Sequence, residues 1–170
     1  MEEQSNTECK VSFTVVIDPM AQPRIKARRM GRHANAPIQI YTPQNARVKE
    51  YKAAIAAAYI EAVGAEDAGH LANRDVFLSV SFVINRPQAM CSSKLPDTNI
   101  NHNKKPDLDN MLKAVMDALN GVAWSDDSNV VRITSDKKYA SIVLGGSSGR
   151  KRLSGPPSVS VSITYLKDEY

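Results

Sequence analysis

The feature that most constrains the fold is a stripe of apolar residues at helical spacing between positions 108 and 119. Apolar residues three and four positions apart lie on one face of an α-helix, and Asn120-Gly121 directly afterwards is a typical helix stop. A helix with one apolar face has to bury that face, so the chain must supply a matching surface. The stripe consists of Leu108, Met111, Leu112, Val115, Met116 and Leu119.

The matching surface is predicted from segments in which apolar and polar residues alternate, which is the period of a half-buried β-strand. The apolar faces of the second and the last segment are either ordinary core or part of a contact between two copies of the chain. The segments are Val11 to Ile17, Val76 to Ile84, Val130 to Thr134 with Tyr139 to Leu144 as a strand or hairpin, and Val159 to Tyr165.

A second helix is predicted to begin at Thr42, its N-cap, with Pro43 at the first helical position, and to end near Gly64. The order strand, helix, strand, helix, strands predicts one α+β or α/β domain over residues 1–170, in which two main helices pack on a mixed β-sheet. Stretches without either period are predicted to be a flexible N-terminus and loops. These stretches are residues 1–10, 19–41, 88–106 and 145–157.

The composition excludes several classes of protein. Apolar residues make up 42% and charged residues 24% of the 170 residues, as in ordinary globular chains. No apolar run approaches the roughly 18 residues of a membrane span, and the N-terminus lacks the cationic and apolar regions of a secretory signal. We therefore expect a cytoplasmic protein that does not enter a membrane. Cys9 and Cys91 are expected to be unpaired, because no Cys-x-x-Cys pair is present.

Positive charge is segregated along the chain, although the net charge is only +4. No acidic residue occurs between Pro19 and Lys49, a predicted basic loop followed by a helix start, and a smaller basic cluster occurs at Arg150-Lys151-Arg152. A surface selected only for solubility mixes both signs, so this segregation favours a polyanionic partner such as nucleic acid. The cations of the first stretch are Arg24, Lys26, Arg28, Arg29, Arg32, Arg47 and Lys49.

Acidic residues gather at both ends of the helix at 108–119, with Asp107 and Asp109 at its start and Asp126-Asp127 past its end. If the chain enters the helix extended, Asp107 and Asp109 project on the same side, where the helix N-terminus favours ionised carboxylates. The connection to the next strand can return Asp127 to the same edge. Three converging carboxylates repel one another without a cation, and oxygen ligands suit Mg²⁺. The alternative interpretation is that Asp107 or Asp109 is only an N-cap and that Asp126-Asp127 is a solvated turn.

Lys113, one turn inside the same helix, also has two interpretations. It lies four residues after Asp109 and four before Asp117, so it can form a surface ion pair worth a few tenths of a kcal/mol. On the side of Asp109 its ammonium group can instead reach a phosphate. Asn110 also has two interpretations: it either orients a metal-bound water or forms hydrogen bonds with the free backbone groups at the helix N-terminus.

The segment from Lys105 to Tyr139 carries a pattern typical of one family. Its residues are Lys105-Pro106-Asp107-Leu108-Asp109-Asn110, Lys113, Asp117-Ala118-Leu119-Asn120-Gly121, Trp124 and Asp126-Asp127-Ser128-Asn129-Val130-Val131. This pattern resembles the RusA family of Holliday junction resolvases, which is typical of bacterial prophages and phages. Outside this segment the resemblance is looser and includes the first strand, the basic loop, Tyr41-Thr42-Pro43 and the second strand.

The resemblance implies a homodimeric, Mg²⁺-dependent endonuclease of mixed α/β fold that cuts branched DNA, with Mn²⁺ able to replace Mg²⁺ and without a small-molecule cofactor. It implies that Holliday junctions are resolved by paired symmetric nicks, in DNA recombination and repair. The family's catalytic, metal-binding aspartates fall on Asp107, Asp109 and Asp127, and its catalytic lysine falls on Lys113.

DNA contacts are expected mainly from the basic loop, where phosphate contacts give affinity without sequence information. This chain departs from the family in a longer basic loop, in the segment Asn99 to Asn103 and in the loop from Gly145 to Pro157, so the DNA contacts are the least transferable part. Tyr41 and Trp124 either stack on an unpaired base or pack in the core. The expected DNA-binding residues are Arg24, Lys26, Arg28, Arg29, Arg32 and Lys105.

Three other functions are weighed against this one. A non-catalytic DNA-binding protein would use the basic loop but would not need grouped carboxylates. A haloacid-dehalogenase-like phosphatase also has an Asp-x-Asp motif, but there a buried apolar strand precedes it, whereas here Lys104-Lys105-Pro106 does. A His-Asn-His nuclease is disfavoured, because the chain has only three histidines: His33, His70 and His102.

Overall fold

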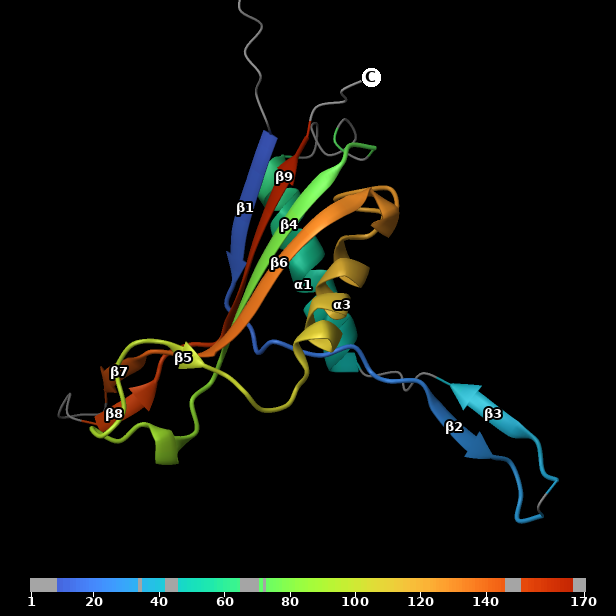
Figure 1. The fold of residues 1–170 in the computed structure, drawn as a ribbon, viewed down its shortest axis with the longest axis horizontal. Helices are drawn as coiled ribbons and strands as arrows, with labels where there is room; N and C mark the ends of the chain where they lie inside the picture. The colour runs from blue at the N-terminus through green and yellow to red at the C-terminus, as the bar shows by residue number, and fades with distance from the viewer. Residues whose placement is uncertain are drawn as a thin grey trace, which may run out of the picture.

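The computed structural model describes residues 9–33, 35–41, 46–64, 71, 73–145 and 151–166. Within them, a five-stranded sheet in the order β1-β9-β4-β6-β5 is covered on one face by α1 (Ala46–Val63) and α3 (Leu108–Leu119) (Figure 1). We call this sheet and its two helices the body. The fold confirms the predicted α+β domain with two helices on a mixed sheet.

Pairing within the sheet is both parallel and antiparallel. Strand β9 (Ser158–Tyr165) lies antiparallel to its two neighbours, β1 (Cys9–Val15) and β4 (Val76–Ile84). Strand β4 runs parallel to β6 (Val130–Tyr139), as strands joined through a crossover helix do. The short strand β5 (Ile100–Asn101) pairs antiparallel with the end of β6.

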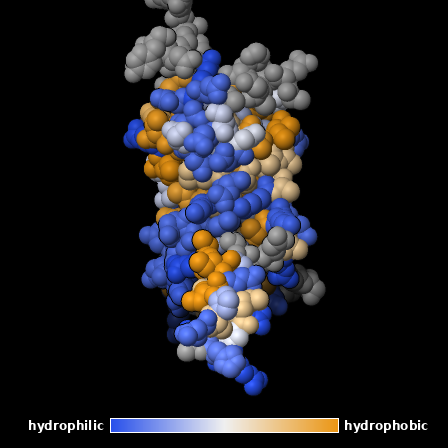
Figure 2. All heavy atoms as spheres, turned by 90° about the vertical axis from the view of Figure 1, so that its right-hand side faces the viewer, coloured by the Kyte–Doolittle hydropathy of each residue, from blue (hydrophilic) through white to orange (hydrophobic). Residues whose placement is uncertain are grey.

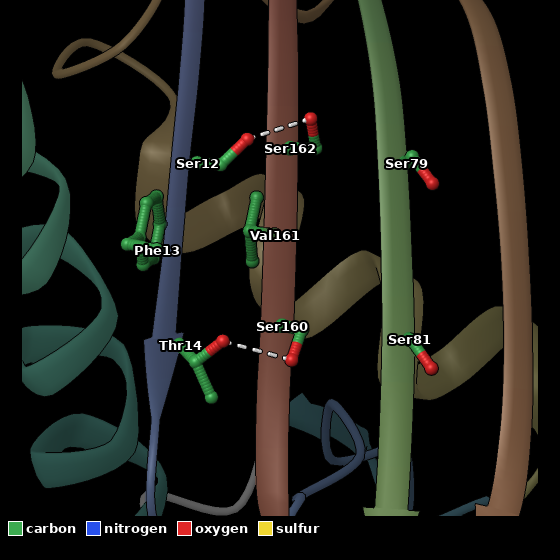
Figure 3. Close-up of a pocket in the computed structure, with 8 residues that line it drawn as sticks. All are labelled: Ser12, Phe13, Thr14, Ser79, Ser81, Ser160, Val161 and Ser162. Atoms are coloured by element: carbon green, nitrogen blue, oxygen red, sulfur yellow. Dashed lines mark hydrogen bonds between the residues drawn. The ribbon is translucent and has the colours of Figure 1, made fainter.

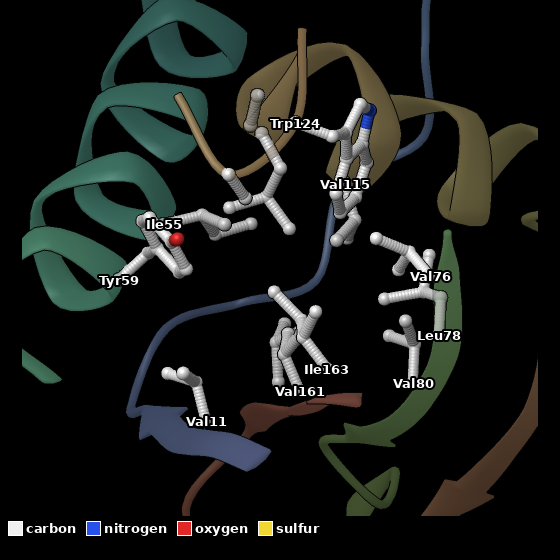
Figure 4. Packing of buried hydrophobic residues seen from close by; sticks show 14 of the residues in the cluster. Val11, Ile55, Tyr59, Val76, Leu78, Val80, Val115, Trp124, Val161 and Ile163 are labelled. Atoms are coloured by element: carbon white, nitrogen blue, oxygen red, sulfur yellow. The ribbon is translucent and has the colours of Figure 1, made fainter. Parts of the chain in front are cut away.

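The core lies between the sheet and the two helices (Figure 4). Alternate residues of β4 and β9 supply it, so the apolar faces of these strands are ordinary core. Tyr59 and Tyr165 are buried with their hydroxyls 2.8 Å apart, and the Tyr165 hydroxyl donates to the Ala123 carbonyl at 2.9 Å. This pairing satisfies two polar groups in an apolar interior. The largest wholly buried side chains include Trp124, Tyr51, Tyr59, Tyr165, Phe82 and Ile55.

Both helices end where the sequence predicts. Gly64 and Gly121, each just past a helix, have φ of +82° and +73°, a conformation that glycine adopts without strain. The two helices are joined by a partly buried ion pair of 2.9 Å between Lys52 and Asp117. The predicted start of the first helix at Thr42-Pro43 lies outside the described residues.

Three predicted loops contain regular structure, which corrects the sequence-based assignment. The basic loop holds a two-stranded hairpin of β2 (Lys26–Arg29) and β3 (Ile38–Tyr41), and we call residues 25–41 the arm. The segment 145–157 contains β8 (Lys151–Ser154), which pairs with β7 (Ile142–Gly145). Strands of four residues are too short for a period-2 pattern to stand out, and cations occupy much of β2 and β8. Segment 88–106 contains a 3-10 turn (Gln88–Met90) and β5.

Smaller differences concern the ends of elements. The first strand ends at Val15 rather than Ile17, and β6 is one continuous strand of ten residues. Cys9 and Lys10 belong to β1, whereas residues 1–8 of the predicted N-terminal tail lie outside the described residues. Both cysteines are free, as expected. Among the helices described, none has the length and apolar character to cross a membrane.

The sheet face turned away from the helices is lined by hydroxyl groups (Figure 3). Ser12 donates to Ser162 across β1 and β9 at 2.9 Å, and Thr14 and Ser160 are joined at the same distance. These small polar residues alternate with the core residues of the same strands, which explains the strand pattern in the sequence. The candidate acidic residues are not part of this face, because they flank α3 on the other side of the sheet.

Candidate active site

Asp107 and Asp109 lie at the N-terminus of α3, as predicted. Asp107 is the extended residue at the N-cap position, but its side chain makes no capping hydrogen bond. Asp109 is already in the first helical turn, so the extended geometry assumed from the sequence ends at Asp107. Both carboxylates are close to the exposed N–H groups and the positive end of the helix dipole, which stabilise negative charge there.

The carboxylate of Asp107 faces the base of the arm. Arg24 donates from Nη2 to Oδ2 of Asp107 at 2.6 Å, and both side chains are substantially exposed. Two residues earlier, the backbone N–H of Gln22 donates to the carbonyl of Asn110 at 2.8 Å. These contacts attach the segment after β1 to the start of α3, although the sequence separates them by more than 80 residues.

A surface hollow of about 510 Å³ opens beside Asp107. Gln22, which lines it, has a side-chain Oε1 that is buried and accepts no hydrogen bond from the described residues. Buried polar atoms without a partner are uncommon in folded proteins, so this oxygen marks the hollow as a place where a ligand or water can bind. The residues lining the hollow are Ala21, Gln22, Arg24, Lys105, Pro106, Asp107 and Asn110.

The chain that leads into Asp107 is held from the sheet by Lys137 of β6. The Lys137 ammonium donates to the carbonyl oxygens of Lys104 and Pro106, each at 2.6 Å. The Lys105–Pro106 peptide bond between these carbonyls is cis. Hydrogen bonds from a charged donor are among the stronger ones in proteins, so Lys137 fixes the turn that positions Asp107.

His102 packs next to this lysine. Its backbone N–H donates to the Lys137 carbonyl at 3.1 Å, and its ring lies 4.4 Å from that of Tyr139. Burial lowers the pKa of His102, and the positive charges of Lys137 and Lys104 lower it further. The imidazole is therefore neutral near pH 7. Through its backbone hydrogen bond, His102 contacts the lysine that holds the turn before Asp107.

Asp126 and Asp127, adjacent in sequence, have different roles. The side chain of Asp126 accepts from the backbone N–H of Ser128 at 2.9 Å and caps the short 3-10 turn Asp127–Asn129. Hydrogen bonds from Ser128 lower the pKa of Asp126. Asp127 instead accepts from Nε1 of the buried Trp124 at 3.0 Å. The solvated-turn interpretation thus fits Asp126, while Asp127 is oriented by a side chain from the core.

Asp127 does not join Asp107 and Asp109 within the chain. It follows the C-terminal end of α3, whereas they flank its N-terminal end, and twelve helical residues span about 18 Å. Figure 1 shows α3 running from the connection that follows β5 toward the turns that precede β6. In the part of the chain that the structure describes, no three His, Cys, Asp or Glu side chains are grouped as a metal site would require. The connection after α3 therefore leaves Asp127 near the opposite end of the helix.

Lys113 is exposed on α3 and lies four residues after Asp109, which places both side chains on the same helix face. The surface ion pair considered from the sequence is not formed with Asp117, because Asp117 binds Lys52 of α1. No hydrogen bond or ion pair of Lys113 or Asp109 occurs among the described residues. Lys113 thus points its charge to solvent beside an acidic residue.

The predicted DNA-binding residues fall into two groups. Arg24 and Lys105 line the hollow beside Asp107. The others belong to the arm: Lys26, Arg28 and Arg29 lie in β2, and Arg32 follows it.

In the second basic cluster, Arg152 donates to the carboxylate of Asp97 and to the Cys91 carbonyl, so it supports the β7–β8 hairpin. Arg150 lies outside the described residues.

The two aromatic residues considered for base stacking differ in how deeply they are buried. Trp124 is wholly buried and packs in the core, while Tyr41 is 40% exposed in the arm. Of the two, only Tyr41 is accessible to a base.

Sequence patterns could have found one supporting residue that was missed. Lys137 pairs in register with Phe82, which is wholly buried, so it occupies a position on the helix-facing side of β6. A lysine at such a position signals a specific partner. Gln22 has no comparable signal, because its contacts depend on how the segment after β1 crosses α3.

A comparison with protein-family models identifies the family of the chain. The family model described as Endodeoxyribonuclease RusA matches residues 17–144, which is most of the chain. The chain belongs to the RusA endodeoxyribonuclease family. The match includes the arm, both helices and every predicted site residue. None of the curated protein sequences matches the chain.

RusA membership makes the protein an endodeoxyribonuclease that hydrolyses phosphodiester bonds, of a family that resolves Holliday junctions in DNA recombination. Binding to branched DNA follows from the same membership, and the family's nucleases generally depend on a divalent metal ion.

Proposed function

We propose that the chain works as a homodimer that resolves four-way DNA junctions by paired symmetric nicks, with Mg²⁺ as its metal ion or Mn²⁺ in its place. The observation that carries the proposal is the acidic pair Asp107 and Asp109 at the N-terminus of α3, beside a hollow lined by Arg24 and Lys105. Acidic side chains that flank cationic ones suit the joint binding of a metal ion and a phosphate.

The donor atoms around Asp107 are compatible with a hard divalent cation. Carboxylate oxygens come from Asp107 and Asp109, and Gln22 contributes a buried oxygen without a donor. Mg²⁺ is usually held by one or two carboxylates together with waters and substrate phosphates. We assign Asp107, Asp109 and Asp127 as its ligands. When bound, the ion polarises the scissile phosphate and lowers the pKa of a coordinated water.

The remaining residues bind and orient the DNA phosphate. Lys113, exposed on the helix face of Asp109, is proposed to stabilise the negative charge that develops on the phosphate oxygens. Arg24 and Lys105 supply positive charge at the hollow, where a phosphate is attracted without regard to sequence. Lys137 keeps the turn before Asp107 in place through its two carbonyl contacts.

A dimer is supported by the position of Asp127. Because α3 separates Asp127 from Asp107 and Asp109 within one chain, the Asp127 of a second copy is the one we propose to complete each site. A two-fold axis then generates two identical sites, as two scissile strands of a four-way junction require. This arrangement makes a specific prediction for mixed dimers.

Mixed dimers of Asp109→Asn and Asp127→Asn chains test this arrangement. Each variant alone should be inactive, while a heterodimer purified through two different tags should regain one intact site and nick one strand of each junction. If sites are built within one chain, both sites of the heterodimer are broken and no nick appears. An inactive heterodimer, shown by sedimentation to be a dimer, would therefore overturn the shared site.

Junction cutting itself is tested with a synthetic four-way junction and a linear duplex of the same sequence, with and without Mg²⁺. We expect the junction to be cut and the duplex to remain intact, and we expect cutting only when Mg²⁺ is present. Asp107→Asn should abolish cutting without weakening junction binding, because a negative charge near a phosphate is removed. Asp126→Asn is the control, since Asp126, the sequence neighbour of Asp127, caps a turn and is not among the proposed ligands. Equal activity on duplex, or equal loss in both variants, would contradict the proposal.

A further inference from the structure

The arm has two chemically different faces. Residues directly opposite each other in an antiparallel pair share a face, and alternate residues of a strand do too. The register pairs Ala27 with Ile40, and Arg29 with Ile38, so one face carries Ala27, Ile38 and Ile40 together with Arg29. The opposite face carries the remaining pairs. These are Lys26 with Tyr41, and Arg28 with Gln39.

Apolar residues on the arm are exposed to an unusual degree. Ile38 and Ile40 are 61% and 71% exposed, and every residue of β2 and β3 is exposed. Five of the eleven large hydrophobic residues exposed in the described chain lie between Ile25 and Tyr41. Figure 2 looks at the side from which the arm projects and shows hydrophobic side chains in its lower part, bordered by hydrophilic ones. Concentrated exposure of this kind indicates an interaction surface.

The position and charge of the arm indicate its partner. Its base lies at the candidate active site, because Gln22 bonds to Asn110 and Arg24 to Asp107. The arm therefore begins beside any DNA phosphate that is held at Asp107. Between Pro19 and Lys49 the sequence has cations but no acidic residue, which matches a polyanion and not a typical protein surface.

We propose that the arm inserts its apolar face, through Ile38 and Ile40, against unstacked bases at the branch point of the junction. Lys26 and Arg28 on the opposite face hold the neighbouring phosphates. Bases at a branch point are less fully stacked than those in a duplex, and aliphatic side chains inserted between base steps are an established way to hold bent DNA. The inference rests on the proposed function and adds a residue-level basis for choosing branched over linear DNA.

The test compares junction and duplex binding for the double variant Ile38→Ser/Ile40→Ser, in a buffer without divalent metal so that no cutting is required. We expect the ratio of duplex Kd to junction Kd to fall on the order of tenfold, because the variant loses the apolar contact with an unstacked base step. A 2-aminopurine at the branch point should brighten when the wild-type protein binds and should stay dim with the variant. Ile60→Ser, the same change at an exposed position of α1, is the matched control.

Two results would overturn the proposal. An unchanged Kd ratio and an unchanged 2-aminopurine signal would show that the apolar face does not touch bases. Loss of dimer in sedimentation with an unchanged Kd ratio would show that a second copy covers this face. Both positions are largely exposed, so an unchanged circular dichroism melt verifies that the body is intact. If the wild-type protein binds junctions but cuts no DNA, the proposed function fails while this test remains valid.

Discussion

The body and the arm use apolar side chains in opposite ways. In the body, large residues such as Phe82 and Trp124 are wholly buried between the sheet and the helices. In the arm, Ile38 and Ile40 have no such cover and every residue of both strands is exposed. A two-stranded hairpin alone is only marginally stable, so we expect the arm to depend for its order on what it binds, whereas the packing of the core orders the body.

The body and the arm therefore differ in what they contribute to the candidate site. The candidate acidic residues are attached to α3 and to the start of β6, elements fixed by the core, so their geometry is set before any ligand arrives. The arm, whose strands are exposed, is the part that we propose to contact the branched DNA. Arg24 and Gln22 connect the two regions at the candidate site.

The sharpest test of the contrast is a comparison of the same kind of truncation in both regions. Phe82→Ala should lower the free energy of unfolding by about 3–5 kcal/mol, because it removes a wholly buried aromatic side chain. Ile40→Ala should change it by less than about 0.5 kcal/mol, as exposed positions do. Urea unfolding followed by circular dichroism measures both. A large loss in Ile40→Ala would show that the arm is packed in solution, and the contrast would fail.

Within the body, Lys137 should affect activity more than its neighbour does. Lys137→Met removes both hydrogen bonds to the turn before Asp107, and we expect junction cutting to slow by about tenfold to a hundredfold. A positioning role predicts a higher Mg²⁺ concentration for half-maximal cutting and partial rescue by Lys137→Arg. Lys138→Met is the control, because Lys138 binds Asp136 at 2.6 Å. Equal kinetics and metal dependence in all three variants would remove Lys137 from the site.

For the arm, the expected effect is on affinity rather than chemistry. Changing Lys26 and Arg28 to glutamine should reduce the magnitude of the log K against log salt slope by about 0.9 for each DNA phosphate that the variant no longer neutralises. Single-turnover cutting at saturating protein should be nearly unchanged, because the candidate carboxylates are untouched. A slope identical to that of the wild type would move the phosphate-binding surface away from the cationic face of the arm.

The smallest expected effect concerns pH. The pKa of His102 is lowered by burial and by nearby lysines, so the unfolded chain takes up a proton at higher pH than the folded one. The free energy of unfolding should therefore decline as pH falls below about 6.5 and should decline less in His102→Gln. His33→Gln in the exposed end of the arm is the control. Urea unfolding at pH 7 and pH 5.5 measures this free energy for the wild type and both variants. An equal decline in all three proteins would contradict the prediction.

The sequence predicted the body better than the arm, for a physical reason. Long periodic segments such as 76–84 and 108–119 show their burial directly, because one face of each packs on the core. Every residue of β2 and β3 is exposed, so no alternation of buried and exposed positions distinguishes these strands from a loop. At the site, the local position of Asp107 was predictable, whereas the place of Asp127 depends on where the turn after α3 leads.

Strand β9 has a consequence for how this protein assembles during synthesis. It is inserted between β1 and β4, and Ser12 of β1 bonds to Ser162, 150 residues later. Among the described strands β1 pairs only with β9, so this pairing waits until residues 158–165 have been made, and such non-local pairing is slow to form. Until then, apolar residues of β1 and β4 are without their neighbour. Cooperative folding of the sheet therefore waits for one late strand, and until that strand is made the apolar faces of β1 and β4 are exposed to aggregation.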